Sequence, residues 1–239
     1  MSIEIQSGID IGPGITISGG PLGPVLSNLT MYLNADDSAS YPGTGSTWFD
    51  ISGNNADITL VGNPTYTSGT PAYFTFNGTS QAGTGSTTGV LSPTEYTKSL
   101  WFYLNAYNDN NFSSSAVGGH FMYMGPGGAS HKVYCGHTDW PVYTAFPSIT
   151  TFNLNTWYYI ACTFDTTVGM ALYVNGILDA TYTANKSAFT GNGSTNIATF
   201  GGTGNWLSGR MSKAFFYNKR LTSGEVLQNF NSTKAEFGY

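Results

Sequence analysis

The stretch Leu172-Tyr173-Val174-Asn175-Gly176-Ile177-Leu178 decides the fold. Asn and Gly readily adopt the positive φ angles that a type I′ turn requires, and apolar residues flank them on both sides. Because such a turn joins antiparallel strands, we expect a β-hairpin here. The run before it, from Trp157 to Phe164, alternates in the same way and places four apolar side chains on one face: Tyr158, Ile160, Cys162 and Phe164.

Short alternating runs recur along the chain, separated by clusters of Gly, Asn, Ser and Pro. They lie at 29–33, 73–76, 99–104, 121–124, 132–135, 171–174, 197–200 and 211–217. This pattern predicts an all-β sandwich of two antiparallel sheets. Cys135 and Cys162 both lie in such runs, so we expect two buried thiols.

One helix is expected near the end of the chain. Thr222 and Glu225 have the spacing of a capping box, and an apolar stripe follows at Val226, Leu227 and Phe230. We expect this short helix to close one end of the sandwich.

The composition restricts the range of partners. Only 9% of the 239 residues are charged, whereas about 25% is typical of soluble domains. A polar, nearly uncharged surface suits contact with sugars or with neighbouring proteins. The net charge is −5 and no basic run occurs, which argues against nucleic acid. No stretch approaches the roughly 20 apolar residues of a membrane span, so membrane insertion is not expected.

Residues 1–24 differ from the rest and are interpreted as an N-terminal arm and linker. Two similar pieces, 3–8 and 15–20, alternate apolar and polar residues around the turn Gly12-Pro13-Gly14. An arm this small cannot bury a core of its own, so we expect it to lie on the main domain, residues 25–239, or on a partner. Anchoring or homo-oligomerisation would then use its isoleucines: Ile3, Ile5, Ile9, Ile11, Ile15 and Ile17.

Several motifs occur in a recognisable order: Tyr41-Pro42-Gly43, 48–55, 74–79, 99–102, 157–161, 172–176 and 209–226. Over residues 25–239 the chain resembles the laminin-G-like, concanavalin A-like lectin jelly roll found in structural proteins of tailed phages. The phage character lies in the segments 11–15 and 225–231, and it implies a virion component. The resemblance implies an all-β, two-sheet antiparallel jelly-roll sandwich with a short N-terminal strand arm and one short C-terminal helix.

Catalysis is not expected. Retaining glycosidases need two carboxylates about 5 to 5.5 Å apart, and the resemblance implies that hydrolases of this fold place them in a Glu-x-Asp-x-x-Glu pattern. The four glutamates of the chain, Glu4, Glu95, Glu225 and Glu236, show no such arrangement.

Three loop segments combine aromatic rings with amide or carboxylate groups and are candidate contact sites. Their residues are Tyr107, Asn108, Asp109 and Phe112, then Asp139 and Trp140, then Asn205 and Trp206. Such groups fit either a glycan or a neighbouring protein, and both alternatives stay open.

No cofactor is required, but the resemblance makes calcium a candidate ligand. In the loop 50–57, Asp50, Asn54 and Asp57 carry the hard oxygen atoms that calcium prefers. The alternative is a tight turn in which Asp50 and Asn54 bond to local backbone amides.

The leading interpretation is a non-enzymatic protein on the virion surface, either a capsid decoration or a fibre component. Its partners would be other virion proteins and further copies of itself. The alternative is a lectin-like module that recognises cell-surface glycan, with or without calcium.

Overall fold

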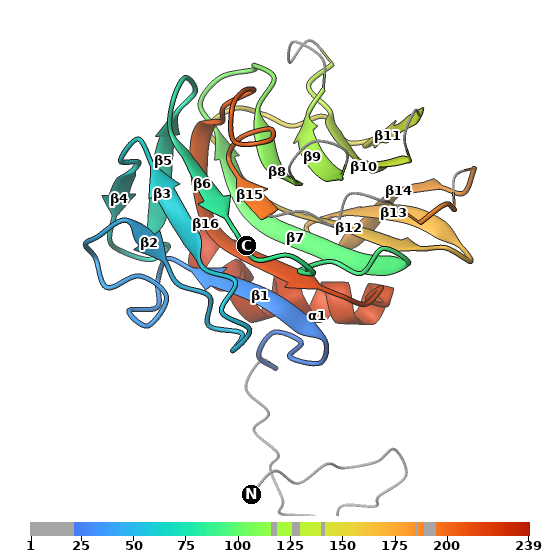
Figure 1. Cartoon of the computed structure of the whole chain (residues 1–239), viewed down its shortest axis with the longest axis horizontal. Helices are drawn as coiled ribbons and strands as arrows, with labels where there is room; N and C mark the ends of the chain where they lie inside the picture. Colours follow the sequence, from blue (N-terminus) through green and yellow to red (C-terminus); the bar gives the residue numbers. More distant parts are fainter. Residues whose placement is uncertain (1–21, 116–118, 126–129, 140–141, 185, 189–194) are drawn as a thin grey trace, which may run out of the picture.

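The computed structural model describes residues 22–115, 119–125, 130–139, 142–184, 186–188 and 195–239. Two eight-stranded sheets form a sandwich, which confirms the predicted fold (Figure 1). Every pair of neighbouring strands is antiparallel. The predicted arm with its six isoleucines, Ile3 to Ile17, lies outside the described residues, and so does Trp140.

Sheet A has the order β14-β13-β12-β7-β16-β5-β4, and β1 also pairs with β16. Its strands are β1 (Leu29–Asn34), β4 (Thr65–Thr67), β5 (Tyr73–Asn77), β7 (Glu95–Leu104), β12 (Trp157–Asp165), β13 (Gly169–Val174), β14 (Ile177–Tyr182) and β16 (Ser208–Tyr217). Sheet B has the order β11-β10-β9-β8-β15-β6-β3-β2. Its strands are β2 (Thr47–Trp48), β3 (Ile58–Val61), β6 (Ala82–Gly85), β8 (Asn111–Ser115), β9 (His120–Met124), β10 (Val133–Asp139), β11 (Val142–Pro147) and β15 (Thr195–Ile197).

The hairpin that the sequence predicts at Asn175-Gly176 joins β13 to β14. Val174 pairs with Ile177, and the two turn residues have φ angles of 50° and 80°. A side chain on Gly176 would press against Leu227 and Phe230, so the turn also needs a glycine for space.

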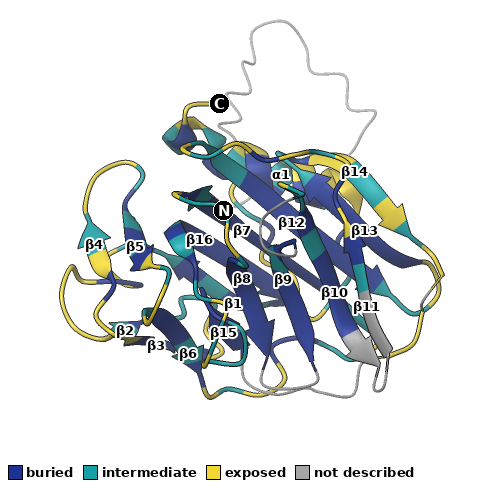
Figure 2. Ribbon diagram, turned by 90° about the horizontal axis from the view of Figure 1, so that it is seen from above, coloured by how far each residue is buried: buried dark blue, intermediate teal, exposed yellow. Residues whose placement is uncertain are grey.

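The main core fills the space between the two sheets. Alternate residues of each strand point into it, as the period-two pattern requires. Its large, fully buried side chains include Trp48, Phe74, Phe102, Phe112 and Phe164. Cys135 from sheet B and Cys162 from sheet A also face this core as free thiols, which confirms the prediction of two buried thiols. The central strands are buried along their length, whereas β14 at the edge is more exposed (Figure 2).

A second apolar layer lies on the other side of sheet A. The helix α1 (Ser223–Thr233) and the 3-10 helix η2 (Lys234–Phe237) cover the outer face of this sheet. Trp101 of β7 stacks on Phe237 with 3.8 Å between ring centroids, and its indole nitrogen donates to Thr233 Oγ1 at 2.9 Å. The prediction that the helix closes one end of the sandwich is therefore wrong, because β7, β12 and β16 carry apolar residues on both faces.

The local details of the helix agree with the sequence except at one position. Thr222 accepts a hydrogen bond from the Glu225 amide, and the Glu225 carboxylate accepts one from the Thr222 amide, which confirms the capping box. Val226 and Phe230 are buried, but Leu227, expected in the same stripe, is 37% exposed.

The predicted strand at 197–200 is also shifted. The strand β15 ends at Ile197, and Ala198 takes a left-handed conformation with φ of 63°. The chain therefore leaves the sheet there, and Phe200 lies in a loop instead of a strand.

Replacing Phe237 with alanine should lower the free energy of unfolding by about 3 kcal/mol, because the ring stacks on Trp101 in a buried layer. Urea denaturation followed by tryptophan fluorescence measures this. Val168→Ala serves as the control, because Val168 is 45% exposed in a turn and should change stability by no more than about 0.5 kcal/mol. Equal stability of Phe237→Ala and the native chain would contradict the second layer.

Candidate functional site

The outer face of sheet B carries aromatic and amide side chains. In β9, Met122 points into the core, so its neighbours Phe121 and Tyr123 point outward. Asn111 of β8 pairs with Tyr123, and the register shifts between Asn111 and Ser113. Tyr134 of β10 lies on the other side of Tyr123, with 5.6 Å between their ring centroids.

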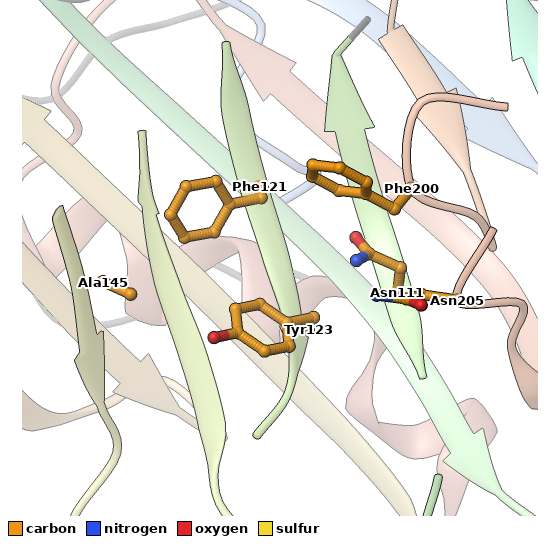
Figure 3. A pocket seen from close by; sticks show the side chains of 6 residues that line it. All are labelled: Asn111, Phe121, Tyr123, Ala145, Phe200 and Asn205. Atoms are coloured by element: carbon orange, nitrogen blue, oxygen red, sulfur yellow. The ribbon is translucent and has the colours of Figure 1, made fainter. Parts of the chain in front are cut away.

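A cavity of about 270 Å³ opens on this face. It is lined by residues from β8, β9, β11 and the loop after β15: Asn111, Phe121, Tyr123, Ala145, Phe200 and Asn205 (Figure 3). We call it the sheet B pocket. Phe121 and Asn111 form a buried floor, whereas Tyr123 and Phe200 are half-buried and Asn205 is exposed.

Backbone bonds hold the loop that completes the pocket. The Phe200 amide donates to the Gly204 carbonyl at 2.8 Å, and the Asn111 amide donates to the Asn205 carbonyl at 3.1 Å. Asn205 has a φ of 46°, a conformation that asparagine tolerates better than most residues. These bonds fix Phe200 and Asn205 relative to β8.

A buried lysine braces the floor from the core side. Lys98 of β7 is fully buried, and its ammonium group donates to the carbonyl oxygens of Phe121 and Gly136. Desolvation by burial lowers the pKa of Lys98. The amine therefore ties β7 of sheet A to β9 and β10 of sheet B, directly beneath the pocket.

The pocket combines apolar rings with neutral hydrogen-bonding groups. Burial is the main cause that raises the pKa of Tyr123, and the nearby Tyr134 and Asp109 raise it further. Tyr123 is therefore a neutral phenol at physiological pH, able to donate and accept. The amide of Asn205 carries both a donor and an acceptor, whereas the amide nitrogen of Asn111 bonds to the carbonyls of Ser113 and Met122 at 3.2 Å and leaves its oxygen as an acceptor.

Among the described residues that line the pocket there is no catalytic pair of carboxylates. The three glutamates in the described part of the chain all serve elsewhere. Glu95 accepts from the Arg220 amide, Glu225 caps α1, and Glu236 pairs with Lys213 at 2.8 Å.

The structure brings only part of the predicted contact residues to this pocket. Asn205 lines it, and Asp109 is close enough to Tyr123 to affect the pKa of that phenol. Trp206 is half-buried next to Asn205, and Asn108 is exposed next to Asp109. Neither of these last two lines the pocket.

Phe112 is wrong as a contact residue. Alternation along β8 turns its ring into the main core, where it lies 4.3 Å from Phe102 between centroids and is fully buried. Tyr107 makes its contacts within the protein. Its ring stacks on His131 with 3.7 Å between ring centroids, and its hydroxyl donates to the Phe152 carbonyl. Asp139 ends β10 opposite Val142.

Sequence reasoning missed Phe121, Tyr123, Phe200 and Asn111. The run at 121–124 was identified as a strand, and its alternation does place two rings on the face opposite Met122. The sequence alone does not give the order of the strands or the position of the helix. In the described part of the chain, α1 covers sheet A and no helix covers this face of sheet B.

The calcium candidate loop is held by hydrogen bonds within the protein. Asp50 Oδ1 accepts from the amides of Tyr32 and Ser52, and Oδ2 accepts from the Ser52 hydroxyl and the Ala56 amide. Asp57 accepts from the Asp50 amide at 2.8 Å. The bonds of Asp50 to the Ser52 and Ala56 amides are those that the local-turn alternative predicts, whereas the Tyr32 amide belongs to β1.

Asn54 in the same loop bonds through its side-chain amide nitrogen to the Leu29 carbonyl at 3.0 Å. Within the described residues, no cluster of three or more His, Cys, Asp or Glu side chains could hold a metal ion. Calcium binding stays a prediction that the structure does not test.

Comparison with known families agrees with this architecture. A sequence model described as the concanavalin A-like lectin/glucanases superfamily matches residues 76–227. The chain belongs to this superfamily. No curated protein matches the chain in sequence.

Several solved structures share the fold. One is botulinum neurotoxin type C, which depends on interaction with two ganglioside molecules to enter cells (TM-score 0.70, 13% identity, 87% of this chain and 52% of that chain). Another is the binding domain of botulinum neurotoxin DC in complex with rat synaptotagmin II (0.68, 14%, 87% and 52%). The chain thus spans about half the length of these toxin structures.

A third structure matches over nearly its whole length. It is domain 4 of AbnA, an extracellular arabinanase from Geobacillus stearothermophilus, in complex with arabinotriose (TM-score 0.64, 18% identity, 85% of this chain and 98% of that chain). At these identities the likeness concerns the fold. In the part of the chain that the structure describes, no helix combines the length and apolar character needed to cross a membrane.

Replacing Asp50 with asparagine should lower the free energy of unfolding by about 2 kcal/mol, because an amide nitrogen cannot accept the hydrogen bonds that one carboxylate oxygen now accepts. Asp57→Asn is the matched control. Its amide oxygen can still accept from the Asp50 amide, so it should change stability by no more than about 0.5 kcal/mol. Urea denaturation compares the two.

The unfolding temperature of the native chain should be the same in calcium and in a chelator, because internal bonds already satisfy both oxygens of Asp50. Differential scanning fluorimetry measures it. A drop on chelation would show that calcium contributes to the folded state.

Proposed function

We propose that this protein is a non-enzymatic glycan-binding module and that the sheet B pocket is its binding site. The observation that carries the proposal is the composition of the pocket, in which Phe121, Tyr123 and Phe200 stand beside the amides of Asn111 and Asn205. A sugar ring has an apolar face of C–H groups and an edge of hydroxyl groups. Aromatic rings suit the first and neutral amides suit the second.

The proposal gains support from proteins of the same fold. The arabinanase domain is bound to arabinotriose, and the type C neurotoxin interacts with gangliosides. These facts concern those proteins, and only the arabinanase domain is matched over nearly its whole length, so it is the one that supports sugar binding by this fold. Among the described residues that line the pocket no carboxylate pair occurs, which favours binding over hydrolysis.

We further propose that the module acts on the surface of a virion, as a capsid decoration or a fibre component. The support is sequence evidence: the low charge of the chain, the resemblance to phage structural proteins and the isoleucine-rich arm. Glycan binding would then serve adhesion to a host surface. Electron microscopy of particles, with an antibody against the chain, would test this setting independently of any sugar.

Tyr123→Ala and Phe200→Ala should each weaken glycan binding about tenfold, since each removes one half-buried ring from the pocket. A glycan array identifies the ligand, and isothermal titration calorimetry measures its affinity for each variant. Phe49→Ala is the control, because Phe49 is 41% exposed and does not line the pocket. Binding that survives both substitutions would place the site elsewhere.

The charges around the pocket favour a neutral glycan. All eight lysine and arginine residues of the chain lie in the described part, and none lines the pocket. Lys98 lies beneath the floor, where its ammonium group is bonded to carbonyls and cannot reach a ligand. Asp109 near Tyr123 adds a negative charge that would repel sialylated or uronic-acid sugars.

Asp109→Asn should therefore raise binding of acidic glycans several-fold while leaving neutral ones nearly unchanged. The array should be run at low salt, where a partly exposed charge acts most strongly. Asp37→Asn controls for net charge, since Asp37 lies in the turn after β1 and caps it by accepting from the Ala39 amide. If the native chain prefers acidic glycans, the assignment of ligand class is wrong even if the pocket binds sugar.

A further inference from the structure

The first described residues of the chain are held along α1 by the side chains of the helix. Gln228 donates through Nε2 to the Gly23 carbonyl at 2.8 Å, and Asn229 Oδ1 accepts from the Val25 amide at 2.8 Å. Both partners are backbone groups of an extended segment that belongs to no sheet. Side-chain amides of the helix therefore bond to the backbone of this segment, in place of the backbone groups that a neighbouring strand would provide.

We call these two hydrogen bonds, from Gln228 and to Asn229, the α1 clamp, and Tyr217 of β16 supports it. The Tyr217 hydroxyl donates to the Val25 carbonyl at 2.9 Å and accepts from Asn229 Nδ2 at 2.9 Å. Asn229 is fully buried, so its amide bonds at both ends and is fixed in orientation. The chain leaves this clamp toward its N-terminus at Leu22.

A cavity of about 350 Å³ lies on the helix at the point where the clamp ends. It is lined by Leu22, Gly224, Leu227, Gln228 and Asn231, and we call it the α1 groove. Leu22 is 72% exposed and Leu227 is 37% exposed. Apolar side chains with an amide rim on either side form the kind of surface that binds an extended apolar segment.

We propose that the α1 groove is the docking site of this chain's own segment Ile15–Gly20, with Ile17 packed against Leu22 and Leu227. The segment lies next to the groove in sequence, because Ile17 is five residues before Leu22 and at most about 17 Å of extended chain separates them. Gly19 and Gly20 allow the chain to turn back. The short tether gives the segment a high effective concentration at the groove, which favours it over a second copy.

The side chains of the segment also match the surface. Alternation in Ile15-Thr16-Ile17-Ser18 puts both isoleucines on one face, so that they can cover the two leucines. Backbone groups of the segment could bond to the Asn231 side chain, in the manner in which Gly23 and Val25 bond to Gln228 and Asn229.

Length decides how much of the arm can dock there. The helix has 11 residues and is therefore about 16 Å long. The 21 residues before Leu22 would extend to about 70 Å. The groove can thus hold only the nearer half of the arm, and Ile3 to Ile11 would lie beyond it, free to reach another molecule.

A cysteine cross-link in the full chain tests the proposal. Ile17→Cys combined with Leu227→Cys should form a disulfide within one chain under mild oxidation, seen as a faster monomer band on a non-reducing gel and as a linked peptide by mass spectrometry. Thr16→Cys combined with Leu227→Cys is the control, because its tether is almost equally long but residue 16 would lie on the opposite face of the docked segment, and it should remain largely unlinked. The native Cys135 and Cys162 are fully buried and do not compete.

Three outcomes would overturn the proposal. Covalent dimers in place of linked monomers would show that another copy occupies the groove. Equal linking of both pairs would show that the arm samples the surface without docking. No linking of the first pair, in a protein whose circular dichroism is native, would show that the segment lies elsewhere.

A second measurement needs no cysteine. Leu227→Ser should increase amide hydrogen exchange in residues 15–18 several-fold, because it removes the apolar wall they pack against. Leu178→Ser is the matched control, since Leu178 is also a half-exposed leucine and does not line the groove. Unchanged exchange in Leu227→Ser would contradict the docking. None of these readouts depends on glycan binding.

Discussion

Sheet A is buried on both faces, and this constraint organises the molecule. Along β7, alternate residues point into the main core and toward the helices, so that Phe102 lies inside the sandwich and Trp101 lies under Phe237. Sheet B has no such cover in the described residues. The sheet B pocket lies on its outer face, beside the loop that carries Phe200 and Asn205.

The same arrangement explains the unusual place of polar groups. Strands buried on both sides leave no solvent-facing positions for polar residues, so polar side chains inside sheet A must find protein partners. Ser212 bonds to the Ala72 carbonyl and Lys213 pairs with Asp36. Lys213 and Asp36 thus form an ion pair beside sheet A, whereas the described residues that line the sheet B pocket are uncharged.

Local pattern did not reveal β2, β3, β4, β6, β8 or β11. It was enough to predict the longer strands β7, β12 and β16, the hairpin at Asn175-Gly176 and the capping box at Thr222. Each of these depends on a few neighbouring residues, whose backbone preferences agree with the fold. The position of α1 was not predictable from its own residues, because Val226 and Phe230 would pack equally well on any apolar face. The candidate binding face depends on strand order, since Asn111, Phe121 and Phe200 come from β8, β9 and a loop almost 80 residues further on. Phe112 lies in the core because it alternates with Asn111 along β8.

Lys98 restrains the backbone beneath the sheet B pocket. The side-chain nitrogen of Lys98 donates hydrogen bonds to the Phe121 and Gly136 carbonyls, which belong to two adjacent strands. Rotation of either peptide plane would break one of these buried hydrogen bonds. A surface anchored in this way is set before any ligand arrives and loses little freedom when one binds. A glycan-binding pocket on this floor, as we propose, would recognise its ligand by fixed shape, and changes in the loop around Phe200 and Asn205 would alter its choice of sugar sooner than movement of the floor.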